Sequence, residues 1–395
     1  MPEPIPPSAL PSIMQGFEAL PDPRRAHRRA YPLQEMLLVA LCAISSDADD
    51  WVHVAEWGEL KLPWLRRFLP FAAGVASHDT FSRLFSMLDG AQFAKCFAGW
   101  MAKLCPSLAG QSIAIDGKSV RGSHDCGAGM AHLVSAWHHG AGVTLGQVKT
   151  ATKSNEISAI PELLEMLDIA GATITLDAMG CQREIVQHIV RREGDYIIAV
   201  KNNQPTLAQA IEGLFDPARA TASVAPLAHD LRVDKDHGRL NTRRCVVHND
   251  LGALGEDLHK AWPGLKSAVM IESTREVIQG RDKAAPSTEW RYYISSRVLD
   301  AAEFSRQIQS HWQIENGCHW VLDVVFDEDA SRVRRDHGAE NMALLRRMSL
   351  NLIKQDKASK GSIKVKRKRA AWSTDYLEQL LELTPLVDAL GSELP

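Results

Sequence analysis

Three acidic residues each lie on or directly after an apolar segment, and this pattern constrains the chain more than any other feature. Asp116 follows the apolar residues 113–115, and Asp177 follows residues 174–176. Both runs predict buried strands, which would leave the two carboxylates at strand ends. Glu315 lies in a segment with helical periodicity. Neighbouring carboxylates repel each other unless a cation neutralises them, and hard oxygen ligands favour Mg²⁺ or Mn²⁺. The pattern therefore indicates a site for two such ions over a phosphodiester.

The composition is that of an ordinary globular protein and excludes several other classes. The 395 residues are 45% hydrophobic and 24% charged, with a formal net charge of −3, so total charge does not indicate a nucleic-acid binder. Seven scattered cysteines have neither metal-site nor disulfide spacing, which predicts reduced thiols. The longest apolar run, residues 36–44, is too short to cross a bilayer, and no signal-peptide pattern begins the chain. We therefore expect a cytoplasmic protein with no membrane partner.

The periodicity of the chain changes near residue 107. Residues 1–14 are rich in proline and predict a flexible leader, whereas residues 15–106 have helical periodicity and predict a helical N-terminal domain. Beyond residue 107 strand and helix patterns alternate. We expect strands at 112–115, 132–137, 143–149, 172–176 and 196–200, and helices at 156–167 and 183–192. Three leading strands followed by helix-separated strands are typical of an α/β, ribonuclease-H-like core, a mixed sheet flanked by helices.

Two later segments depart from this core. Residues 216–298 lack helical periodicity and predict a β-rich insertion, which closing helices at 301–326 and 339–355 would follow. We place the whole catalytic domain at residues 107–355. Residues 357–369 contain seven basic residues and no acidic one, so they form either a solvated linker or a track along phosphates. Residues 356–395 are then expected to form a basic linker and a C-terminal helix.

The segment around Glu315 leaves alternatives open. His311 and His319 lie four residues to either side of Glu315, on one face of the expected helix, and such spacing could suggest zinc. One continuous helix spaces these three groups too far apart for a zinc site, so this alternative is disfavoured. Asp323 and Asp327 continue the same spacing and compete with Glu315 as the third carboxylate, unless they simply form a solvated face.

Basic, polar and aromatic residues near these carboxylates are candidates for contact with nucleic acid. Trp312 and Trp320 are either core residues or surfaces on which an unpaired base stacks. Residues of the other types are more often part of an ordinary surface. The candidates are Arg24, Arg25, Lys118, Arg121, Lys153, Lys201, Asn202, Arg239, His311, Trp312, Asn316 and Trp320.

Longer motifs surround these residues, including AIDGKSVRGS, HLVSAW, KSNEI, DAMGCQ, GDYIIAVKNNQ and HWQIENGCHWVLDVVFDEDASR. Together they resemble the DDE transposases of bacterial insertion sequences, in the subgroup of H-repeat-associated proteins. The resemblance extends over about residues 15–355. It implies that Asp116, Asp177 and Glu315 form the DDE triad. Asp116 would bridge two Mg²⁺ or Mn²⁺ ions, and the other two carboxylates would each complete one side.

The resemblance also implies an activity and partners. The expected reaction is metal-dependent DNA strand cleavage and strand transfer at insertion-sequence ends, without a covalent protein–DNA intermediate. The N-terminal domain would bind double-stranded DNA with terminal inverted repeats, and the need to pair two ends favours a homodimer on DNA. Such a protein is expected to associate with the nucleoid.

The chain departs from the pattern of many related transposases at four positions. Those proteins carry a Tyr-x2-Arg-x3-Glu-x6-Lys signature, where this chain has Ile308, His311 and Leu322 in place of the Tyr, Arg and Lys. A glutamate that usually follows the HGR segment is replaced by Asn241. The main alternative is a catalytically silent, element-derived DNA-binding protein, which would bind DNA without cleaving it. A host nuclease would cleave without end specificity, and the basic run disfavours a small-molecule hydrolase.

Overall fold

The computed structural model describes residues 12–124, 129–150, 156–216, 228–236, 239–277 and 285–381. The chain divides into two compact units. The first consists of Met1–Ser107, Gly117–Asp168 and Ile314–Pro395, and the second consists of Leu108–Asp116 and Ile169–Gln313. Strand β1 (Ser112–Ser119) contributes to both units because the boundary falls between Asp116 and Gly117.

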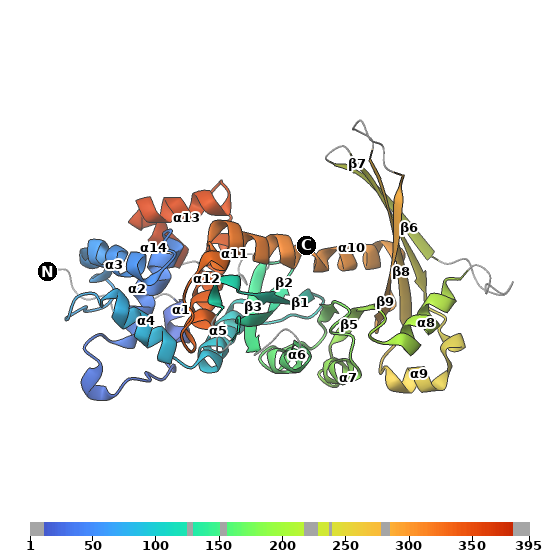
Figure 1. Ribbon diagram of the computed structural model, residues 1–395, viewed down its shortest axis with the longest axis horizontal. Helices are drawn as coiled ribbons and strands as arrows, with labels where there is room; N and C mark the ends of the chain where they lie inside the picture. Colours follow the sequence, from blue (N-terminus) through green and yellow to red (C-terminus); the bar gives the residue numbers. More distant parts are fainter. Residues whose placement is uncertain are drawn as a thin grey trace, which may run out of the picture. The chain divides into compact units, whose positions relative to one another are not determined.

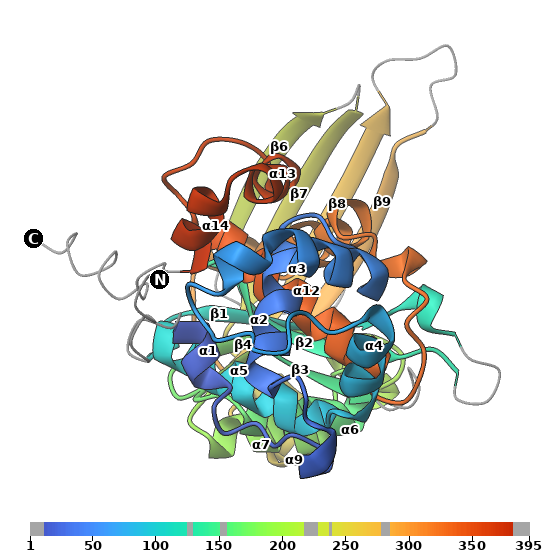
Figure 2. The ribbon, with the colours of Figure 1, turned by 90° about the vertical axis from the view of Figure 1, so that its left-hand side faces the viewer.

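The first unit begins with helices. They are α1 (Ser12–Gly16), the short 3₁₀ helix η2 (Ala26–Arg28), α2 (Leu33–Ser45), α3 (Trp51–Leu65), α4 (His78–Met87) and α5 (Gly90–Leu104). Asp50 caps α3 by accepting a hydrogen bond from the main-chain N–H of His53, and Asp89 caps α5 in the same way through Gln92. Almost every residue of α2 is buried, so this helix forms the centre of the N-terminal helical region (Figure 2).

Helix α12 (Gly338–Gln355) is the central element of the first unit. It packs against α2, α4, α5 and strand β3, and its residues from Gly338 to Ile353 are buried. Two buried amides fix its position. Asn341 donates to the main-chain carbonyls of Phe85 and Leu88, and Asn351 pairs with the main chain of Thr144. These bonds specify one register, because a shift of the helix would leave buried polar groups unsatisfied.

A buried hairpin completes the core of the first unit. Strands β2 (His132–His138) and β3 (Val143–Thr150) are antiparallel, with Ala136 opposite Gly146. Helices α5 and α12 pack against β3, and α6 (Glu156–Glu165) packs against both strands. Every residue of the two strands except Lys149 is buried, including polar ones such as Ser135 and Gln147.

The second unit contains the parallel part of the sheet. Strands β1, β4 (Thr173–Leu176) and β5 (Asp195–Val200) run parallel, with Ile113 opposite Ile174 and Ile174 opposite Tyr196. Helix α7 (Arg183–Arg191) connects β4 to β5 and packs against β5. Strand β9 (Ser287–Ser295) then pairs antiparallel with β5.

Four antiparallel strands follow in the second unit (Figure 1). Strands β6 (Ala228–Asp236), β7 (Arg239–His248) and β8 (Ser267–Val277) join β9 in this part of the sheet. The elements between them are α8 (Pro205–Leu214), η6 (Gly252–Leu254) and α9 (Gly255–Ala261). Helix α10 (Ala301–His311) packs against β6 and β7, where Phe304 and Ile308 join a core that includes Cys245, Val269 and Ile271.

The complete sheet has nine strands in the order β3-β2-β1-β4-β5-β9-β8-β7-β6. The predicted fold class is therefore confirmed: a mixed sheet flanked by helices, with a helical N-terminal region and a β-rich insertion. The exact domain boundaries stay a prediction. Within the described ranges, no helix is both long and apolar enough to cross a membrane.

The expectation of one uninterrupted helix through Glu315 is wrong. After α10 the chain makes a turn at Trp312 and then forms a π-helical segment, η7 (Glu315–His319). It continues as α11 (Trp320–Val325) and the 3₁₀ helix η8 (Glu328–Ala330). A π turn inserts one extra residue, so four-residue spacing no longer defines a single face along this segment.

The segment expected to be a basic linker is helix α13 (Ile363–Trp372), which α14 (Thr374–Leu381) follows. Arg367 is buried in it, and its guanidinium donates to the main-chain carbonyls of Ile44 and Ala48 and to Asp49. Two of the basic residues, Lys366 and Arg367, are therefore internal. A guanidinium can serve in this way because its planar array of donors satisfies several carbonyls at once.

We predict that Arg367→Met will lower the free energy of unfolding by about 3 kcal/mol, because it leaves buried carbonyl groups and Asp49 without their donor. Urea unfolding monitored by tryptophan fluorescence measures the change. Lys368→Met, one residue away on the exposed side of α13, is the matched control and should stay within about 0.5 kcal/mol of the wild type. Equal effects of the two substitutions would contradict the structural role of Arg367.

Candidate active site

The second unit brings the ends of two neighbouring strands together. Ile115 on β1 is the register partner of Leu176 on β4, and Asp116 and Asp177 are the next residues of the two strands. Paired strands lie about 4.8 Å apart, so the two half-buried acidic residues are neighbours across the pair, with Asp116 inside β1 and Asp177 just beyond β4. The sequence predicts Asp116 at the end of a strand over 112–115, and this is wrong, because β1 continues to Ser119 and Asp116 lies within it. Asp177 does follow its strand directly, as expected.

The carboxylate of Asp177 is oriented by its own loop. Its Oδ1 accepts hydrogen bonds from the main-chain N–H groups of Met179 at 2.9 Å and Gly180 at 3.2 Å. Asn203, which follows β5, donates to the carbonyl of Ala178 and so supports the same loop. These bonds involve only one carboxylate oxygen, and they hold the group in one orientation at the end of β4.

His311 lies beside Asp177 at the C-terminal end of α10. It is buried, and its Nδ1 forms a 2.9 Å hydrogen bond with Oγ1 of Thr175 on β4. Burial lowers the pKa of His311 from 6.5 to about 4, although the charge of Asp177 acts in the opposite direction. The imidazole is therefore neutral near pH 7, and any contact it makes with nucleic acid would be a hydrogen bond, not an ion pair.

A cavity of about 160 Å³ opens next to these residues in the second unit. Its lining includes Asp177, Lys201, Arg291, His311 and Trp312. The Trp312 side chain is 48% exposed, and the guanidinium carbon of Arg291 lies 5.4 Å from its ring centroid. Trp312 is thus not an ordinary core residue. Its open ring and the adjacent cations form a surface that suits a planar or anionic group.

Glu315 begins the π-helical segment of the first unit and is exposed. Its Oε2 forms a 2.7 Å hydrogen bond with Nδ1 of the buried His319. This hydrogen bond lowers the pKa of Glu315, and electrostatic interactions with His319 and Lys118 lower it further, against the effect of partial burial. His319 therefore orients the carboxylate and keeps it ionised.

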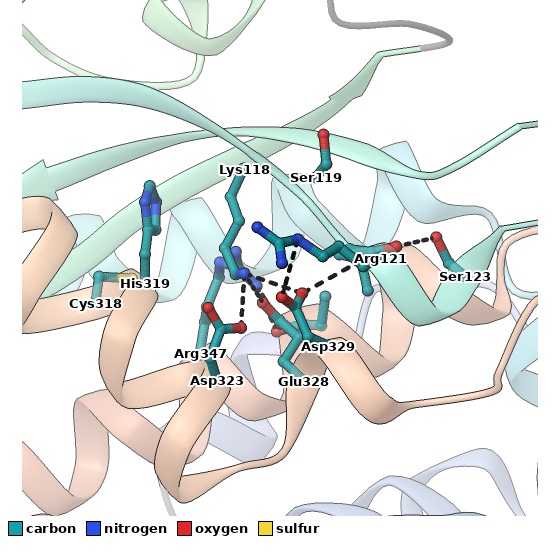
Figure 3. Close-up of polar contacts among 12 residues, drawn as sticks. Lys118, Ser119, Arg121, Ser123, Cys318, His319, Asp323, Glu328, Asp329 and Arg347 are labelled. Atoms are coloured by element: carbon teal, nitrogen blue, oxygen red, sulfur yellow. Dashed lines mark hydrogen bonds and ion pairs between the residues drawn. The ribbon is translucent and has the colours of Figure 1, made fainter.

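Lys118 has a different environment from the one expected for a phosphate contact. Only 8% of the side chain is exposed, and its Nζ lies 2.7 Å from Oδ1 of Asp323 and 3.3 Å from Oδ1 of Asp329 (Figure 3). Glu328 is 4.0 Å away. Lys118 is thus enclosed by carboxylates, and Asp323, a competing third carboxylate by spacing, is the partner of this ammonium.

The remaining candidates differ in how accessible they are. Arg24 is bound to Asp22 and to the carbonyl of Tyr31, whereas the neighbouring Arg25 is exposed. Arg121 is 81% exposed, although it also pairs with Asp329. Trp320 is 57% exposed, so its core assignment does not hold. The other exposed candidates are Lys201, Asn202, Arg239 and Asn316. Lys153 lies outside the described residues.

Comparison with known proteins identifies the family. Residues 109–352 match the family described as Transposase DDE domain, and residues 14–101 match the one described as DDE_Tnp_1-associated. The chain belongs to the DDE transposase family. The predicted resemblance to this family is therefore confirmed.

Two relatives in Escherichia coli match nearly full length. The "Putative transposase YncI" of strain O157:H7 is 40% identical over 94% of this chain and 95% of its own length. The "H repeat-associated putative transposase YhhI" of strain K12 is 37% identical over 94% of this chain and 98% of its own. A cryo-EM structure of the piggyBac transposase synaptic complex with hairpin DNA gives a TM-score of 0.39 at 11% identity, covering 98% of this chain and 82% of that chain.

The low pKa of His311 predicts a pH dependence of stability. Unfolding restores the ordinary value of 6.5, so the unfolded chain binds the proton first and stability is lost as pH falls from about 6.5 to about 4. This difference in pKa between the folded and unfolded chain corresponds to about 3 kcal/mol in the free energy of unfolding. We predict that the free energy of unfolding of the wild type, in metal-free buffer, will decrease between pH 7 and pH 4 by about 3 kcal/mol more than that of His311→Gln. Urea unfolding at both pH values measures the difference, and parallel losses would contradict the prediction.

Proposed function

We propose that this chain is a metal-dependent DNA transposase that cleaves DNA strands and transfers them at the ends of an insertion sequence. The observation that carries the proposal is the match to the DDE family together with the register of β1 and β4, in which Asp116 within β1 and Asp177 directly after β4 each follow a residue of the last registered pair, Ile115 and Leu176. Glu315, in the motif HWQIEN, is the third member of the proposed triad.

The donor set of the proposed triad fits Mg²⁺ or Mn²⁺. All three groups are carboxylates, and such hard cations prefer oxygen ligands. Asp177 is held by main-chain N–H groups through one oxygen only, and the hydrogen bond from His319 favours the ionised form of Glu315. Two bound ions would activate the attacking water or 3′-hydroxyl and stabilise the leaving oxygen of an in-line displacement.

The residues around the triad have supporting parts in this proposal. His319 holds Glu315 in one orientation, and the loop after β4 does the same for Asp177. His311 supports β4 through Thr175 without adding charge. Fixed orientation matters because a ligand that must be ordered on binding costs conformational entropy, and a misplaced ligand weakens metal affinity.

The proposed partner is double-stranded DNA that carries terminal inverted repeats, bound by a homodimer. The exposed residues Arg25, Lys201 and Arg239 supply cations that suit a phosphate backbone. Trp312 is exposed beside Asp177, so a base that leaves the stack near the cleaved bond could rest on its ring. The requirement to join two element ends is what favours a dimer on DNA.

The triad is tested by strand cleavage of labelled element-end DNA with Mg²⁺ or Mn²⁺. We predict that Asp116→Asn, Asp177→Asn and Glu315→Gln will each abolish cleavage and leave DNA binding in place, because each removes a ligand charge without changing the size of the side chain. Glu162→Gln, an exposed acid on α6, is the matched control and should cleave like the wild type.

Wild-type activity in any of the three variants would remove that residue from the triad. A wild-type protein that binds the ends but does not cleave them would instead identify a catalytically silent member of the family. Cleavage without preference for the element ends would favour a general nuclease on the same fold.

The salt dependence of DNA binding distinguishes phosphate contacts from internal charges. We predict that Arg25→Ala and Arg239→Ala will each weaken binding and reduce the slope of log Kd against log salt concentration by about one. Lys118→Met should leave that slope unchanged, because the ammonium is enclosed by carboxylates. Fluorescence anisotropy at four salt concentrations measures all three slopes. A reduced slope for Lys118→Met alone would contradict this assignment.

A further inference from the structure

The three residues that follow Asp116 are held on both sides by buried polar groups of the first unit. Successive side chains of a strand point to opposite faces, so Lys118 faces one way while Gly117 and Ser119 face the other. Figure 3 shows Lys118 directed at the acidic cluster and Ser119 directed away from it. The cluster consists of Asp323, Glu328 and Asp329, which lie on α11 and η8.

On the side of the acidic cluster, Lys118 is part of a network of ion pairs that extends to helix α12. Glu328 on η8 and Arg347 on α12 form an ion pair of 3.0 Å, and both side chains are fully buried. Lys118 lies between this pair and the two aspartates, and Arg121 reaches Asp329 from the exposed side. The ammonium therefore adds to the charge of Arg347 and Arg121 in balancing the three carboxylates, and it is the cation that pairs with Asp323. Burial raises the pKa of Asp323, and the charge of Lys118 counteracts this effect.

On the opposite side, the strand contacts a buried histidine and glutamate. Nδ1 of His132 forms a 2.9 Å hydrogen bond with Oγ of Ser119, and Nε2 of the same ring bonds to Oε1 of Glu156. A Cβ atom at Gly117 would lie within 2.6 Å of both the histidine ring and the glutamate carboxylate. Only glycine lets these groups approach the backbone, so the strand has almost no freedom to shift on this side.

We propose that Lys118 is a positioning residue for the metal site. Its ammonium ties the end of β1, directly after Asp116, to α11 and η8, which follow Glu315 in the chain. The inference rests on the proposed function, because it assumes that Asp116 and Glu315 bind metal. It goes beyond that function because Lys118 acts without contact to DNA or to the ions.

The physical reason is the narrow tolerance of a metal site for ligand movement. Hydrogen-bonded partners behind the ligands typically change metal affinity by about 10–100-fold when they are removed. Without the ammonium, the carboxylates of Asp323 and Asp329 would repel each other, and α11 and η8 would move away from the strand. The part of β1 that directly follows Asp116 would then lose its tie to the segment that continues from Glu315.

The test compares the full-length protein with Lys118→Met, which keeps the length and apolar stem of the side chain and removes its charge. Mn²⁺ binding is measured on the protein without DNA by electron paramagnetic resonance, and cleavage is measured as a function of Mn²⁺ concentration. We expect Mn²⁺ affinity to fall by about 10–100-fold. Excess Mn²⁺ should restore cleavage, while Kd for element-end DNA and its salt slope should match the wild type.

Two further variants keep the test decisive. Lys118→Arg retains a charge that can pair with Asp323 and should recover most of the lost Mn²⁺ affinity. Lys260→Met, which removes an exposed lysine paired with Glu256, is the matched control and should change neither binding curve. If Lys118→Met does not fold, Asp323→Asn provides a milder change at the other end of the ion pair, with the same expected fall in Mn²⁺ affinity.

The outcomes separate this inference from the proposed function. Unchanged Mn²⁺ affinity in folded Lys118→Met, with or without a lower melting temperature, would overturn the positioning role. A reduced salt slope for DNA would also overturn it, because Lys118 would then contact a phosphate. If the wild type binds Mn²⁺ but does not cleave DNA, the proposed function fails while the Mn²⁺ measurements still test Lys118.

Discussion

The parallel pairing of β1 with β4 is the interaction on which the candidate site depends. It aligns Ile115 with Leu176, and the next residue of each strand is an aspartate. A shift of one residue would turn the apolar side chains of one strand to the opposite face and separate the two acids along the sheet edge. Because both strands are buried on both faces, such a shift would also disrupt the core. Packing and the geometry of the carboxylates are therefore fixed by the same register.

Buried charged side chains specify how the elements of the first unit are arranged, which its apolar core alone does not. Arg367, Arg347 and Lys118 are all internal. Arg367 and Lys118 are matched by carbonyls or carboxylates from segments far away in sequence, and Arg347 pairs with Glu328, 19 residues before it. Such groups add little net stability compared with an apolar core, but a displaced partner leaves a charge uncompensated. They therefore act mainly on specificity: they permit one arrangement of α2, α12 and α13 and penalise the alternatives.

The sequence predicted the elements whose signals are local. The mostly apolar run at residues 172–176 predicts a strand, and residues 173–176 form β4. The match of the motifs around Asp116 and Glu315 to a known family was also confirmed. The partners of Lys118 could not be predicted, because Asp329 is 211 residues away and nothing local distinguishes a buried lysine from an exposed one. Likewise, Arg367 belongs to a run that reads as a linker, and only its contacts with residues 44–49 make it internal. The π turn at Glu315 was not predicted, because the four-residue spacing of His311, Glu315 and His319 is also that of an ordinary helix.

The departure at position 311 has a consequence for the charge of the site. Many related transposases have an arginine there, whereas this chain has a buried, neutral imidazole. An arginine would have placed a permanent charge beside Asp177, whereas the imidazole forms a hydrogen bond with Thr175 and adds no charge. Cations do line the neighbouring cavity, but they come from Lys201 after β5 and Arg291 on β9. Arg291 on β9 also lies over the ring of Trp312, which directly follows α10, so the strand supplies the cation and the helix end supplies the aromatic ring. In this chain the cations beside Asp177 are therefore Lys201 and Arg291, of which Arg291 is paired with Glu289.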